Sequence, residues 1–571
     1  MTVIATAGHV DHGKSALVHA LCGTDPDRLP EEKRRGMTID LGFAHRVTDD
    51  GTVLSFVDVP GHSDFVHTMV AGVSGVGAAL LVVDAGEGWM PQTEEHLGIL
   101  EVLGVTTGVV VLSRCDRVDA PSVDERTRQV SARLSSSPVR WTSPVRTSAR
   151  TGEGIKGLVE ALASVARDAV PHRDPLGRPR LFCDRVFTVA GAGTVVTGTL
   201  EGADVRRGDV LTVHRTGEEV RVRDVQTHGA GVDAGVPGTR CALNLSGRGA
   251  DALRRGDVLV RGGQWWSTTV IDADVRVLDS ARTLSRRNGY ALHIGTSEQS
   301  ASVRLIGQEA NARIPAGESG RIRIRFVVPL PLSPGDRFLL RDPGSATTVG
   351  GGTVLDVDPQ ERISRAAPDG TVESQLSRRG WVEIDTARRL TGRALDPVVG
   401  DAFAVPRVVD DTIATLRGRM AEGSLDATVL APHERLLAVE RLGAAEHHGT
   451  VAAASAADEM ESHPVARAVR EDGLTPAPRT ERDAVRRLVQ RGILLEHDGT
   501  AFHRDVLDGL AGVLASLWHT NPEGFTVSQL RAELGITRKH AVPLAACLDR
   551  RGWTRRSGDL RLPGPLVRAQ G

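Results

Sequence analysis

The chain has 571 residues, of which 40% are hydrophobic and 25% charged, and its formal net charge is −2. This composition is typical of a globular protein and excludes disordered, collagen-like and strongly charged classes. No apolar run reaches the ~18 residues that a membrane span needs, and no charged, cleavable leader is visible. We therefore expect a cytoplasmic protein without a membrane anchor, divided into roughly four or more domains.

Two residue types add to this picture. The cysteines form no CxxC pair and no disulfide framework, which fits a reducing compartment. They are Cys22, Cys115, Cys183, Cys241 and Cys547. Of the 70 basic residues, all but four are arginines. The four lysines are Lys14, Lys33, Lys156 and Lys539.

The first residues predict a phosphate-binding loop between a strand and a helix. "VIATAGHVDHGKS" runs from an apolar stretch into the spacing G-x-x-x-x-G-K-[ST], which begins at Gly8. In such a loop, backbone N–H groups surround phosphate oxygens, the lysine reaches the β- and γ-phosphates, and the hydroxyl binds Mg²⁺. The compact charge of lysine suits this position. We predict nucleotide contacts from Asp11, His12, Gly13, Lys14, Ser15 and Ala16.

Two further segments complete the phosphate and metal end of this site. In "FVDVPGH", Asp58 ends an apolar strand and is predicted to hold the metal through water, with Gly61 approaching the γ-phosphate. In "RRGMTID", Thr38 can complete the Mg²⁺ shell while a γ-phosphate is present, and loss of that contact on hydrolysis releases switch loops. The predicted metal ligands are Ser15, Thr38 and Asp58.

Two segments predict guanine recognition. "GVVVLSRCD" ends a strand with Asp116, whose two oxygens can accept from the N1 and N2 hydrogens of guanine. "TSARTGEG" supplies Ser148 and Ala149 as a backbone turn suited to guanine O6. The order and spacing of all these segments predict a GTPase that uses GTP/GDP and Mg²⁺.

"GHVDHGKS", "RRGMTID", "DVPGH" and "QTEEH" resemble the elongation-factor class of translational GTPases. The resemblance implies that His62 is the catalytic residue that orients the attacking water. Val10 and Met37 would be its apolar neighbours until the ribosome stimulates hydrolysis.

The guanine-reading segment departs from the pattern Asn-Lys-x-Asp of that class. Ser113 lacks the two-ended amide of asparagine, while Arg114 can lay its stem along the base, so Asp116 carries the preference for guanine.

The middle of the chain changes to strand patterns. Residues 166–180 are rich in proline and charge and are predicted to form a linker. Alternating apolar residues and repeated Gly-Asp turn signals up to about residue 360 then predict two successive β-barrels. We place a P-loop GTPase domain at 1–170, one barrel at 175–265 and a second at 266–362.

"RLPEEKRRGMTIDLGFA", "DRVFTVAGAGTVVTGT", "GTRCALNLSG" and "GDRFLLRD" with "TVGGGTVLDVDP" resemble the SelB family of selenocysteine-specific elongation factors. The resemblance implies an aminoacyl pocket in the first barrel formed by Asp184, Arg185 and Arg240. A selenol is more acidic than a thiol, which titrates near pH 8.5, so selenocysteine is largely anionic at neutral pH whereas serine is neutral. Two arginines would favour the anion, with Asp184 holding one of them in place.

The C-terminal third predicts another architecture. "AVRRLVQRGILLEHDGTAFH" and "PLAACLDRRGWTRRSGDLRL" each show an amphipathic helix, a strand, a tight turn and another strand. This repeat predicts tandem winged helices, two or three at 370–508 and a terminal one at 509–571. The overall fold class is thus multidomain α/β plus β plus α+β, ending in a tandem winged-helix arm.

The last unit is the basic one, with eight Lys or Arg against three Asp or Glu from Arg531 to Arg561. Such a surface binds closely spaced phosphates. In the family that it resembles, this unit binds a messenger-RNA hairpin (SECIS) just beyond a UGA codon, by shape and backbone. The predicted RNA-binding residues are Arg538, Lys539, His540, Arg555 and Arg556.

The expected function is delivery of selenocysteyl-tRNA to the ribosome at UGA codons by a monomeric GTPase tethered to the mRNA hairpin. A general aminoacyl-tRNA carrier or a GTP-switched RNA-hairpin regulator are the alternatives. A regulator would need no aminoacyl pocket, and substitution of Arg240 would not affect it.

Overall fold

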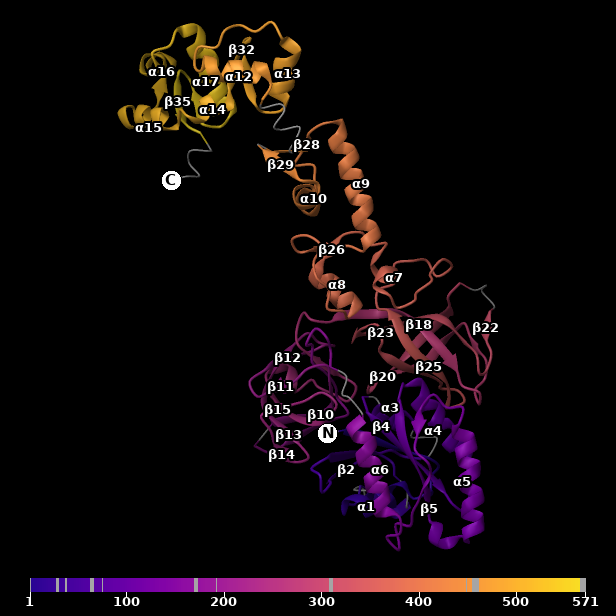
Figure 1. Ribbon diagram of the computed structural model, residues 1–571. Helices are drawn as coiled ribbons and strands as arrows, with labels where there is room; N and C mark the ends of the chain where they lie inside the picture. The colour runs from indigo at the N-terminus through magenta and orange to yellow at the C-terminus, as the bar shows by residue number, and fades with distance from the viewer. Residues whose placement is uncertain are drawn as a thin grey trace. The chain divides into compact units, whose positions relative to one another are not determined.

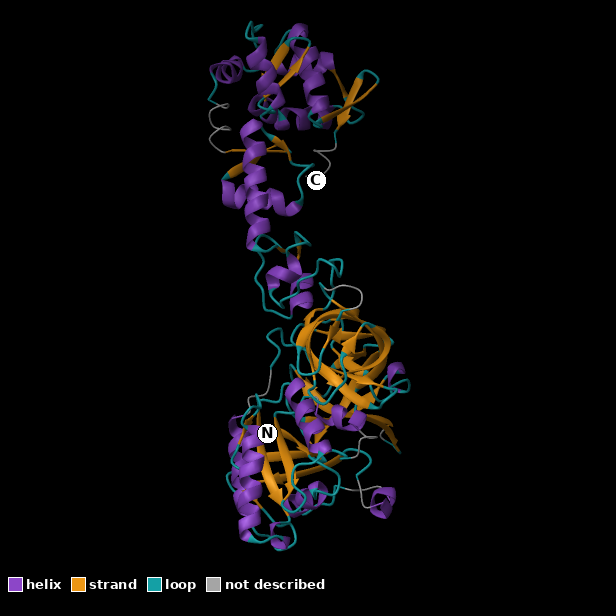
Figure 2. Ribbon diagram, turned by 90° about the vertical axis from the view of Figure 1, so that its right-hand side faces the viewer, coloured by secondary structure: helices purple, strands orange, loops and turns teal. Residues whose placement is uncertain are grey.

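The computed structural model forms two compact units, Met1–Asp396 and Pro397–Gly571. Figures 1 and 2 draw its helices and strands in two views. The residues described are 2–26, 30–35, 38–61, 66–73, 75–168, 173–191, 193–307, 312–447, 449–453 and 462–564. Within these ranges, no helix combines the length and the apolar character that crossing a bilayer requires.

The first domain is a mostly parallel sheet covered by helices. Its strand order is β2-β3-β1-β4-β5-β6, with β7 also paired to β5, and β2 runs antiparallel to β3. The strands are β1 (Thr2–Ala7), β2 (Gly42–Val47), β3 (Val53–Asp58), β4 (Ala78–Asp84), β5 (Thr107–Ser113), β6 (Arg140–Trp141) and β7 (Val145–Arg146). The helices are α1 (Lys14–Cys22), α2 (Pro30–Arg35), α3 (Val66–Val73), α4 (Pro91–Val102), α5 (Ala120–Leu134) and α6 (Ile155–Asp168).

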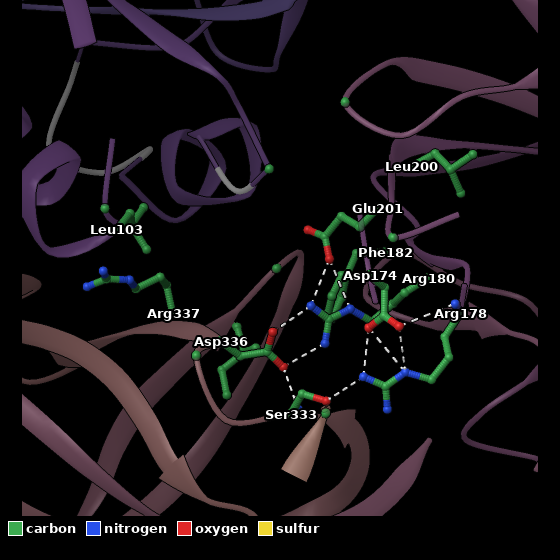
Figure 3. A pocket seen from close by; sticks show the side chains of 18 of the residues that line it. Leu103, Asp174, Arg178, Arg180, Phe182, Leu200, Glu201, Ser333, Asp336 and Arg337 are labelled. Atoms are coloured by element: carbon green, nitrogen blue, oxygen red, sulfur yellow. Dashed lines mark hydrogen bonds and ion pairs between the residues drawn. The ribbon is translucent and has the colours of Figure 1, made fainter. Parts of the chain in front are cut away.

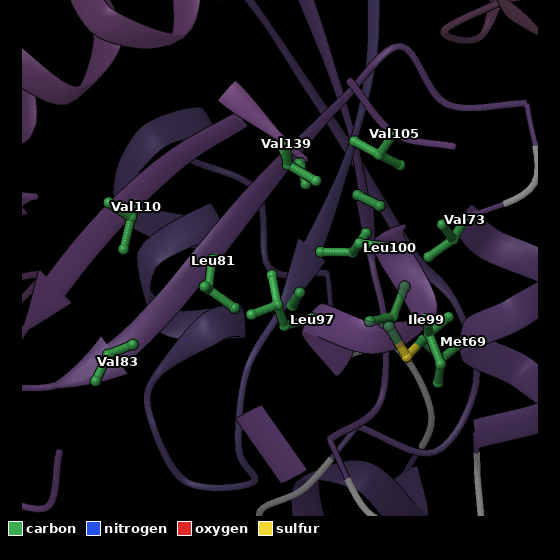
Figure 4. Packing of buried hydrophobic residues seen from close by; sticks show 14 of the residues in the cluster. Met69, Val73, Leu81, Val83, Leu97, Ile99, Leu100, Val105, Val110 and Val139 are labelled. Carbon is green, nitrogen blue, oxygen red and sulfur yellow. The ribbon is translucent and has the colours of Figure 1, made fainter. Parts of the chain in front are cut away.

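Both faces of this sheet are covered, so its central strands are buried at every position. All residues of β1 and β4 are buried. Successive side chains enter different cores: Val3 packs with α3, α4 and α5, whereas Ile4 packs with α1 and α6. Figure 4 shows part of the first core, including Met69, Leu97 and Leu100. The carboxyl ends of the parallel strands therefore meet at one edge, where a nucleotide site is expected.

An antiparallel sheet closes into the first barrel. Its order is β12-β17-β8-β10-β16-β13-β14, and a β12–β13 pairing joins its two sides. Along β16 the buried residues Cys241, Leu243 and Leu245 alternate with partly exposed ones, as the two faces of a barrel require. The strands of this sheet are β8 (Arg180–Phe182), β9 (Arg185–Val189), β10 (Gly193–Glu201), β12 (Val210–Val213), β13 (Glu219–Thr227), β14 (Ala230–Gly231), β16 (Arg240–Ser246) and β17 (Val258–Val260). A small separate ladder pairs β11 (Val205–Arg206) with β15 (Ala234–Gly235).

The second barrel is closed in the order β18-β23-β21-β20-β24-β25. Its strands are β18 (Trp266–Val277), β20 (Arg287–Ile294), β21 (Ser297–Leu305), β23 (Ser319–Leu332), β24 (Arg337–Asp342) and β25 (Thr347–Asp356), beside the short pair β19 (Leu284–Ser285) and β22 (Arg313–Ile314). The first unit ends with α7 (Val372–Leu376), β26 (Val382–Glu383) and α8 (Ile384–Thr391).

Helix α4 joins the first domain to the second barrel. Glu95 accepts hydrogen bonds from the backbone N–H and the hydroxyl of Thr348, at 3.3 and 2.8 Å. Leu278 of the second barrel belongs to the same buried cluster as Leu97 of α4. The helix that borders the nucleotide site is therefore also part of an interdomain contact.

In the stretch 166–180, expected to be a linker, the structure describes residues 166–168 and 173–180. Its first residues complete α6, and it ends by entering β8. Arg178 and Arg180 are buried, because Asp174 and Asp336 pair with their guanidinium groups. The charges of Arg178 and Arg180, which contributed to the linker prediction, are thus neutralised inside an interdomain junction.

The second unit repeats a helix followed by a hairpin. Its first part contains β27 (Ala402–Phe403), α9 (Pro406–Glu422), β28 (Leu425–Asp426), α10 (Pro432–Leu442), β29 (Ala444–His447) and β30 (Thr450–Ala453). Its middle part contains α12 (Pro464–Asp472), α13 (Arg482–Gln490), β31 (Leu494–His497) and β32 (Thr500–His503). Its last part contains α14 (Arg504–Asp508), α15 (Ala511–Thr520), β33 (Phe525–Thr526), α16 (Val527–Leu534), α17 (Arg538–Arg550), β34 (Thr554–Ser557) and β35 (Leu560–Pro563).

The two helix-and-hairpin repeats predicted from the sequence are present as α13 with β31–β32 and α17 with β34–β35. In the first, Asp498 and Gly499 both have positive φ, 49° and 71°, which is the turn that suits a two-residue hairpin. Trp553 packs against the core of the last part. The predicted fold class is confirmed.

Candidate nucleotide and aminoacyl sites

The phosphate loop follows β1 and ends where α1 begins at Lys14. Gly8, Asp11 and Gly13 have positive φ values of 128°, 64° and 84°. A Cβ on Gly8 would lie 2.2 Å from the carbonyl oxygen of Val82, so only glycine fits there. Left-handed residues in such a loop turn successive N–H groups inward, which is the geometry of an anion-binding nest.

Lys14 lies under this loop and is 5% exposed. Its Nζ donates to the carbonyl oxygens of Gly8 and His9, at 3.1 and 2.8 Å. The chain's first lysine is therefore held as a fixed charge beside the predicted phosphate position. Ala16, the last predicted contact of this loop, lies in the first turn of α1.

Helix α4 holds the loop from the other side through two residues that the sequence reasoning did not assign. The N–H of Val10 donates to Gln92 Oε1 at 2.9 Å, and that of Gly8 donates to His96 Nδ1 at 3.0 Å. Burial, followed by the charges of Lys14 and His9, lowers the pKa of His96 to about 3, so its ring stays neutral and can accept. The i, i+4 spacing of Gln92 and His96 in "QTEEH" could have revealed them.

Two of the three predicted metal ligands lie side by side at this loop. Ser15 Oγ and Thr38 Oγ1 are 2.8 Å apart. Adjacent ligands of an octahedral Mg²⁺ with bonds of 2.0–2.1 Å are about 2.9 Å apart, so the two hydroxyls fit neighbouring positions. Asp58 is fully buried, and its Oδ1 accepts from Thr6 Oγ1 at 2.7 Å. Oxygen ligands in this arrangement fit Mg²⁺.

The predicted catalytic segment is described only at its beginning. A Cβ on Gly61 would lie 2.5 Å from Lys14 Nζ and 2.7 Å from the backbone N of Val10, so this glycine lies directly against the phosphate loop. His62 and Met37 lie outside the described residues. The catalytic role of His62 remains a prediction.

The departure in the guanine-reading segment has a structural explanation at Ser113. Its hydroxyl donates to the carbonyl oxygen of His12 at 2.7 Å and so ties the end of β5 to the phosphate loop. Arg114 has a φ of 55° and donates from Nη1 to Asp84 Oδ2 at 3.0 Å. The Arg114 guanidinium is thus anchored to the end of β4. The Ser113 hydroxyl links the end of β5 to the phosphate loop.

Asp116 lies at the base end with a partner that the sequence did not predict. Arg150 donates from Nε and Nη2 to its Oδ2, at 2.9 and 2.7 Å. The Ser148 hydroxyl and then Arg150 hold the pKa of Asp116 below its usual range, so the carboxylate is charged. Both of these bonds fall on one oxygen, and the Arg150 side chain is 72% exposed. Ala149 is exposed between Ser148 and Arg150.

The three predicted pocket residues of the first barrel are close together. Arg240 donates from Nε and Nη2 to Asp184, at 2.9 and 2.8 Å, and from Nη2 to Thr197 Oγ1 at 2.7 Å. Asp184 therefore holds this arginine, as expected. Arg185 instead donates from Nη2 to Asp40 Oδ2 at 2.8 Å, in the first domain.

Both guanidinium groups lie over the ring of Phe43 in β2. The Arg240 Cζ is 3.5 Å and the Arg185 Cζ 4.8 Å from the centre of its ring. A cavity of about 290 Å³ beside this ring is lined by residues that include His45, His228 and Arg240. This cavity is lined by both the first domain and the first barrel, and of the three predicted pocket residues Arg240 lines it.

A larger cavity of about 650 Å³ lies where the first domain meets the two barrels, and it contains none of the predicted site residues. Figure 3 shows Arg180 there between Glu201 and Asp336. Burial alone would lower the pKa of Arg180, but Asp336 and Glu201 raise it above its ordinary value. This cavity is a charged junction between domains.

The predicted RNA-binding residues occupy the start of α17 and strand β34. Arg538, Lys539, Arg555 and Arg556 are exposed, His540 is partly exposed, and none of the four cations forms an ion pair with another described residue. Three of the four remaining cations of this segment are held by other residues, and the fourth, Arg531, is exposed. Arg550 donates to the carbonyl of Glu496, Arg551 pairs with Asp508, and Arg561 pairs with Asp549.

Known families match three parts of the chain. The "Elongation factor Tu GTP binding domain" matches residues 1–168, the "Selenocysteine-specific elongation factor, beta-barrel domain" matches 272–361, and the "Elongation factor SelB, winged helix" matches 517–562.

Curated relatives agree with these matches. The chain is 36% identical to the selenocysteine-specific elongation factors of Desulfomicrobium baculatum and Escherichia coli, over 68% and 69% of its length. These matches cover 61% and 64% of the two relatives, less than two thirds of either. It is 33% identical to elongation factor Tu 2 of Streptomyces avermitilis over 62% of its length, which covers 96% of that protein.

Solved structures share the fold. A bacterial selenocysteine-specific elongation factor matches with a TM-score of 0.65 at 24% identity, covering 98% of this chain and 99% of the other. The SelB factor of Methanococcus maripaludis, solved with a GTP analogue, matches with a TM-score of 0.54 at 24% identity, covering 63% of this chain and 80% of the other.

Proposed function

The chain belongs to the SelB branch of the elongation factor Tu family of translational GTPases, and from this premise we propose that it carries selenocysteyl-tRNA. The single observation that supports this most is the pair of arginines at the boundary of the first domain and the first barrel. Arg240 is fixed by two hydrogen bonds that it donates to Asp184, and the Arg185 guanidinium also lies over the Phe43 ring. Two held cations beside one aromatic ring, of which Arg240 lines the small cavity, favour an anionic selenolate over a neutral serine hydroxyl.

GTP would set the state in which the carrier binds its cargo. The nest formed by Gly8 to Gly13 and the fixed charge of Lys14 suit the phosphates, and Asp116 suits the guanine edge. Ser15 and Thr38 would hold Mg²⁺, which would neutralise the developing charge of phosphoryl transfer. Loss of the γ-phosphate removes the reason for Thr38 to stay beside Ser15, so the segment that follows it is released.

Hydrolysis would be triggered on the ribosome. In this proposal His62 orients the attacking water, and Gly61 lets the segment approach the phosphate loop, as its contacts with Lys14 and Val10 support. The exposed cations of α17 and β34 would hold an mRNA hairpin, which raises the local concentration of the complex at one codon.

Ester protection tests the carrier function directly. Full-length protein with a saturating GTP analogue is mixed with selenocysteyl- or seryl-tRNA of the same tRNA body, and hydrolysis of the aminoacyl ester is followed. We expect strong protection of the selenocysteyl ester alone. Equal protection of both would favour a general aminoacyl-tRNA carrier, and protection of neither would favour the hairpin-binding regulator.

A further inference from the structure

Five peptide units separate the predicted nucleotide sensor from the predicted aminoacyl pocket. At one end of the segment 38–43, Thr38 Oγ1 lies 2.8 Å from Ser15 Oγ, beside the phosphate loop. At the other end, the Phe43 ring lies under the guanidinium groups of Arg185 and Arg240. A change of conformation at Thr38 therefore reaches the pocket through a very short piece of chain.

Asp40 is the charged residue in the middle of this segment, and it faces the first barrel. Its Oδ2 accepts from Arg185 Nη2 at 2.8 Å, and the same nitrogen donates to the carbonyl oxygen of Leu41 at 2.5 Å. Arg255 approaches the other carboxylate oxygen, at 3.8 Å. Two cations of the barrel thus converge on one carboxylate of the first domain.

The position of Asp40 depends on the conformation of the segment itself. Its backbone N–H donates to Glu32 Oε1 at 3.1 Å, as does that of Ile39. Glu32 is buried in α2, which precedes Thr38. The carboxylate that meets Arg185 is thereby held in place by the same stretch of chain that contains the predicted metal ligand.

The two pocket arginines differ in what holds them. Arg240 donates its hydrogen bonds to Asp184 and Thr197 within its own barrel, and its contact with the first domain is the stacking on Phe43. Arg185 is held by Asp40 and Leu41, both in the first domain. We propose that Asp40 is a positioning residue that fixes Arg185 for the aminoacyl group only while the segment 38–43 has this conformation. Affinity for selenocysteyl-tRNA is thereby coupled to the γ-phosphate; this inference rests on the proposed carrier function.

The hydrogen bonds of Arg185 are compatible with a second anion. Its bonds within the described part of the chain come from Nη2, so Nη1 and Nε remain as donors for a selenolate. The side chains of Arg185 and Asp40 are 24% and 34% exposed, and a partly exposed pair of this kind contributes little to folding stability. Removal of Asp40 should consequently change the pocket without unfolding the chain.

The test measures affinities of the full-length chain for selenocysteyl- and seryl-tRNA, each with saturating GTP analogue and with saturating GDP. Saturation removes any effect of the variants on nucleotide affinity. We expect Asp40→Ala to lower selenocysteyl-tRNA affinity in the GTP form at least five-fold, the lower end of typical allosteric couplings. Affinity in the GDP form and for seryl-tRNA should not change.

Three variants make the assignment specific. Asp40→Asn keeps an acceptor oxygen for Arg185 Nη2 and should retain part of the affinity. Asp40→Ala in an Arg185→Ala background should cost nothing further, because the two residues act through one contact. Asp50→Ala removes an equally close ion pair, with Arg167 at 2.7 Å, on the far end of the β2–β3 hairpin and should behave as wild type.

The outcomes separate this inference from the function on which it rests. If the wild type prefers selenocysteyl-tRNA and Asp40→Ala keeps the full GTP-to-GDP ratio, the positioning role is overturned and the carrier function stands. An increased affinity of Asp40→Ala would also overturn it, since Asp40 would then compete with the selenolate. A wild type with no preference between the two tRNAs refutes the carrier function and this inference together.

Discussion

Arg180 at the start of the first barrel and Asp336 before β24 of the second form a two-pronged ion pair. The Nη1–Oδ2 distance is 2.6 Å and the Nη2–Oδ1 distance is 2.7 Å, and Arg180 is 7% exposed (Figure 3). Trp265 stacks on the same guanidinium, with the Arg180 Cζ 4.6 Å from the ring centre. This pair therefore joins the two barrels at a buried point.

Removing Asp336 should loosen the junction between the barrels. Breaking a buried pair typically costs about 3–5 kcal/mol, and we expect the lower end, about 3 kcal/mol, for Asp336→Ala because Glu201 still pairs with Arg180. Guanidinium-induced unfolding followed by tryptophan fluorescence should show a barrel transition at lower denaturant. Asp204→Ala, which removes the partner of the exposed Arg173, serves as the control and should shift it little. Equal midpoints for the two variants would contradict the prediction.

The Ser113 hydroxyl should support nucleotide binding by anchoring the phosphate loop. Ser113→Ala removes the 2.7 Å bond to the His12 carbonyl, and a typical hydrogen bond of about 1 kcal/mol corresponds to a loss of about five-fold in affinity. Titration with a fluorescent GDP analogue measures this loss. Unchanged affinity would contradict this anchoring role, since the other contacts of the loop, Gln92 and His96 among them, would then hold it in place.

Asp116 should determine the preference for guanine. Asp116→Asn replaces a carboxylate acceptor with an amide, which loses a charge-assisted bond worth about 1.5–3 kcal/mol, or about 10- to 150-fold in GTP affinity. The same amide can donate to the 2-oxo group of xanthine, so binding of XTP should rise. Competition between GTP and XTP measures both changes. Arg150→Ala is the matched control, since it removes only an exposed partner of Asp116 and should change affinity far less.

The parts that the sequence predicted well are those whose signals are local. The spacing from Gly8 to Ser15 predicted the phosphate loop, because glycines and a lysine are needed at fixed offsets within one turn of chain. The helix-and-hairpin repeats were predicted for the same reason, since their periods and turns lie within a few residues. Such patterns can be read without knowing any tertiary contact.

The contacts that the sequence did not reveal join residues far apart in a chain whose cations are nearly all arginines. Arg150 lies 34 positions from Asp116, and Arg185 lies 145 positions from Asp40. Composition placed Arg180 in a predicted linker, although its side chain is buried. Which arginine meets which carboxylate depends on how the domains pack, so no local pattern could select these pairs.

A stacked histidine pair should make the contact between the first domain and the first barrel sensitive to acid. The rings of His45 and His228 are 4.2 Å apart, and the His228 ring nitrogen Nε2 is 3.0 Å from Ser55 Oγ. Burial, then the charges of His45 and Arg240, lower the pKa of His228 from 6.5 to about 4. The neutral ring is the form that the fold favours.

The lowered pKa of His228 determines how its contribution to stability changes with pH. The unfolded chain binds the proton more readily, so the contribution of His228 to stability is present above pH 6.5 and is lost as the pH falls toward about 4. Thermal unfolding of the wild type and of His228→Asn should diverge across this range, with the wild type losing more on acidification. Asparagine tolerates the φ of 54° at this position, and buried His12 and His96 affect both proteins equally. Parallel pH profiles would contradict the prediction.

The proposed RNA-binding surface of the last part should include fewer cations than the charge count of the segment indicates. Arg550, Arg551 and Arg561 are engaged by Glu496, Asp508 and Asp549, so the exposed cations at α17 and β34 remain for phosphates. Lys539→Ala should weaken binding of an RNA stem-loop taken from just beyond an in-frame UGA codon. If Lys539 contacts one phosphate, the slope of log affinity against log salt should fall by roughly 0.7–0.9. Fluorescence anisotropy at several salt concentrations measures both quantities.

The control for this surface is an exposed arginine of the neighbouring helix-and-hairpin part. Arg487→Ala removes a cation from α13. Helix α13 precedes the β31–β32 hairpin in the same way that α17 precedes the β34–β35 hairpin. We expect it to leave both the affinity and the salt slope close to wild type, because the predicted contacts lie on α17 and β34. Equal effects of Lys539→Ala and Arg487→Ala would instead mean that RNA binding is spread over both parts, as a non-specific attraction to exposed cations would be.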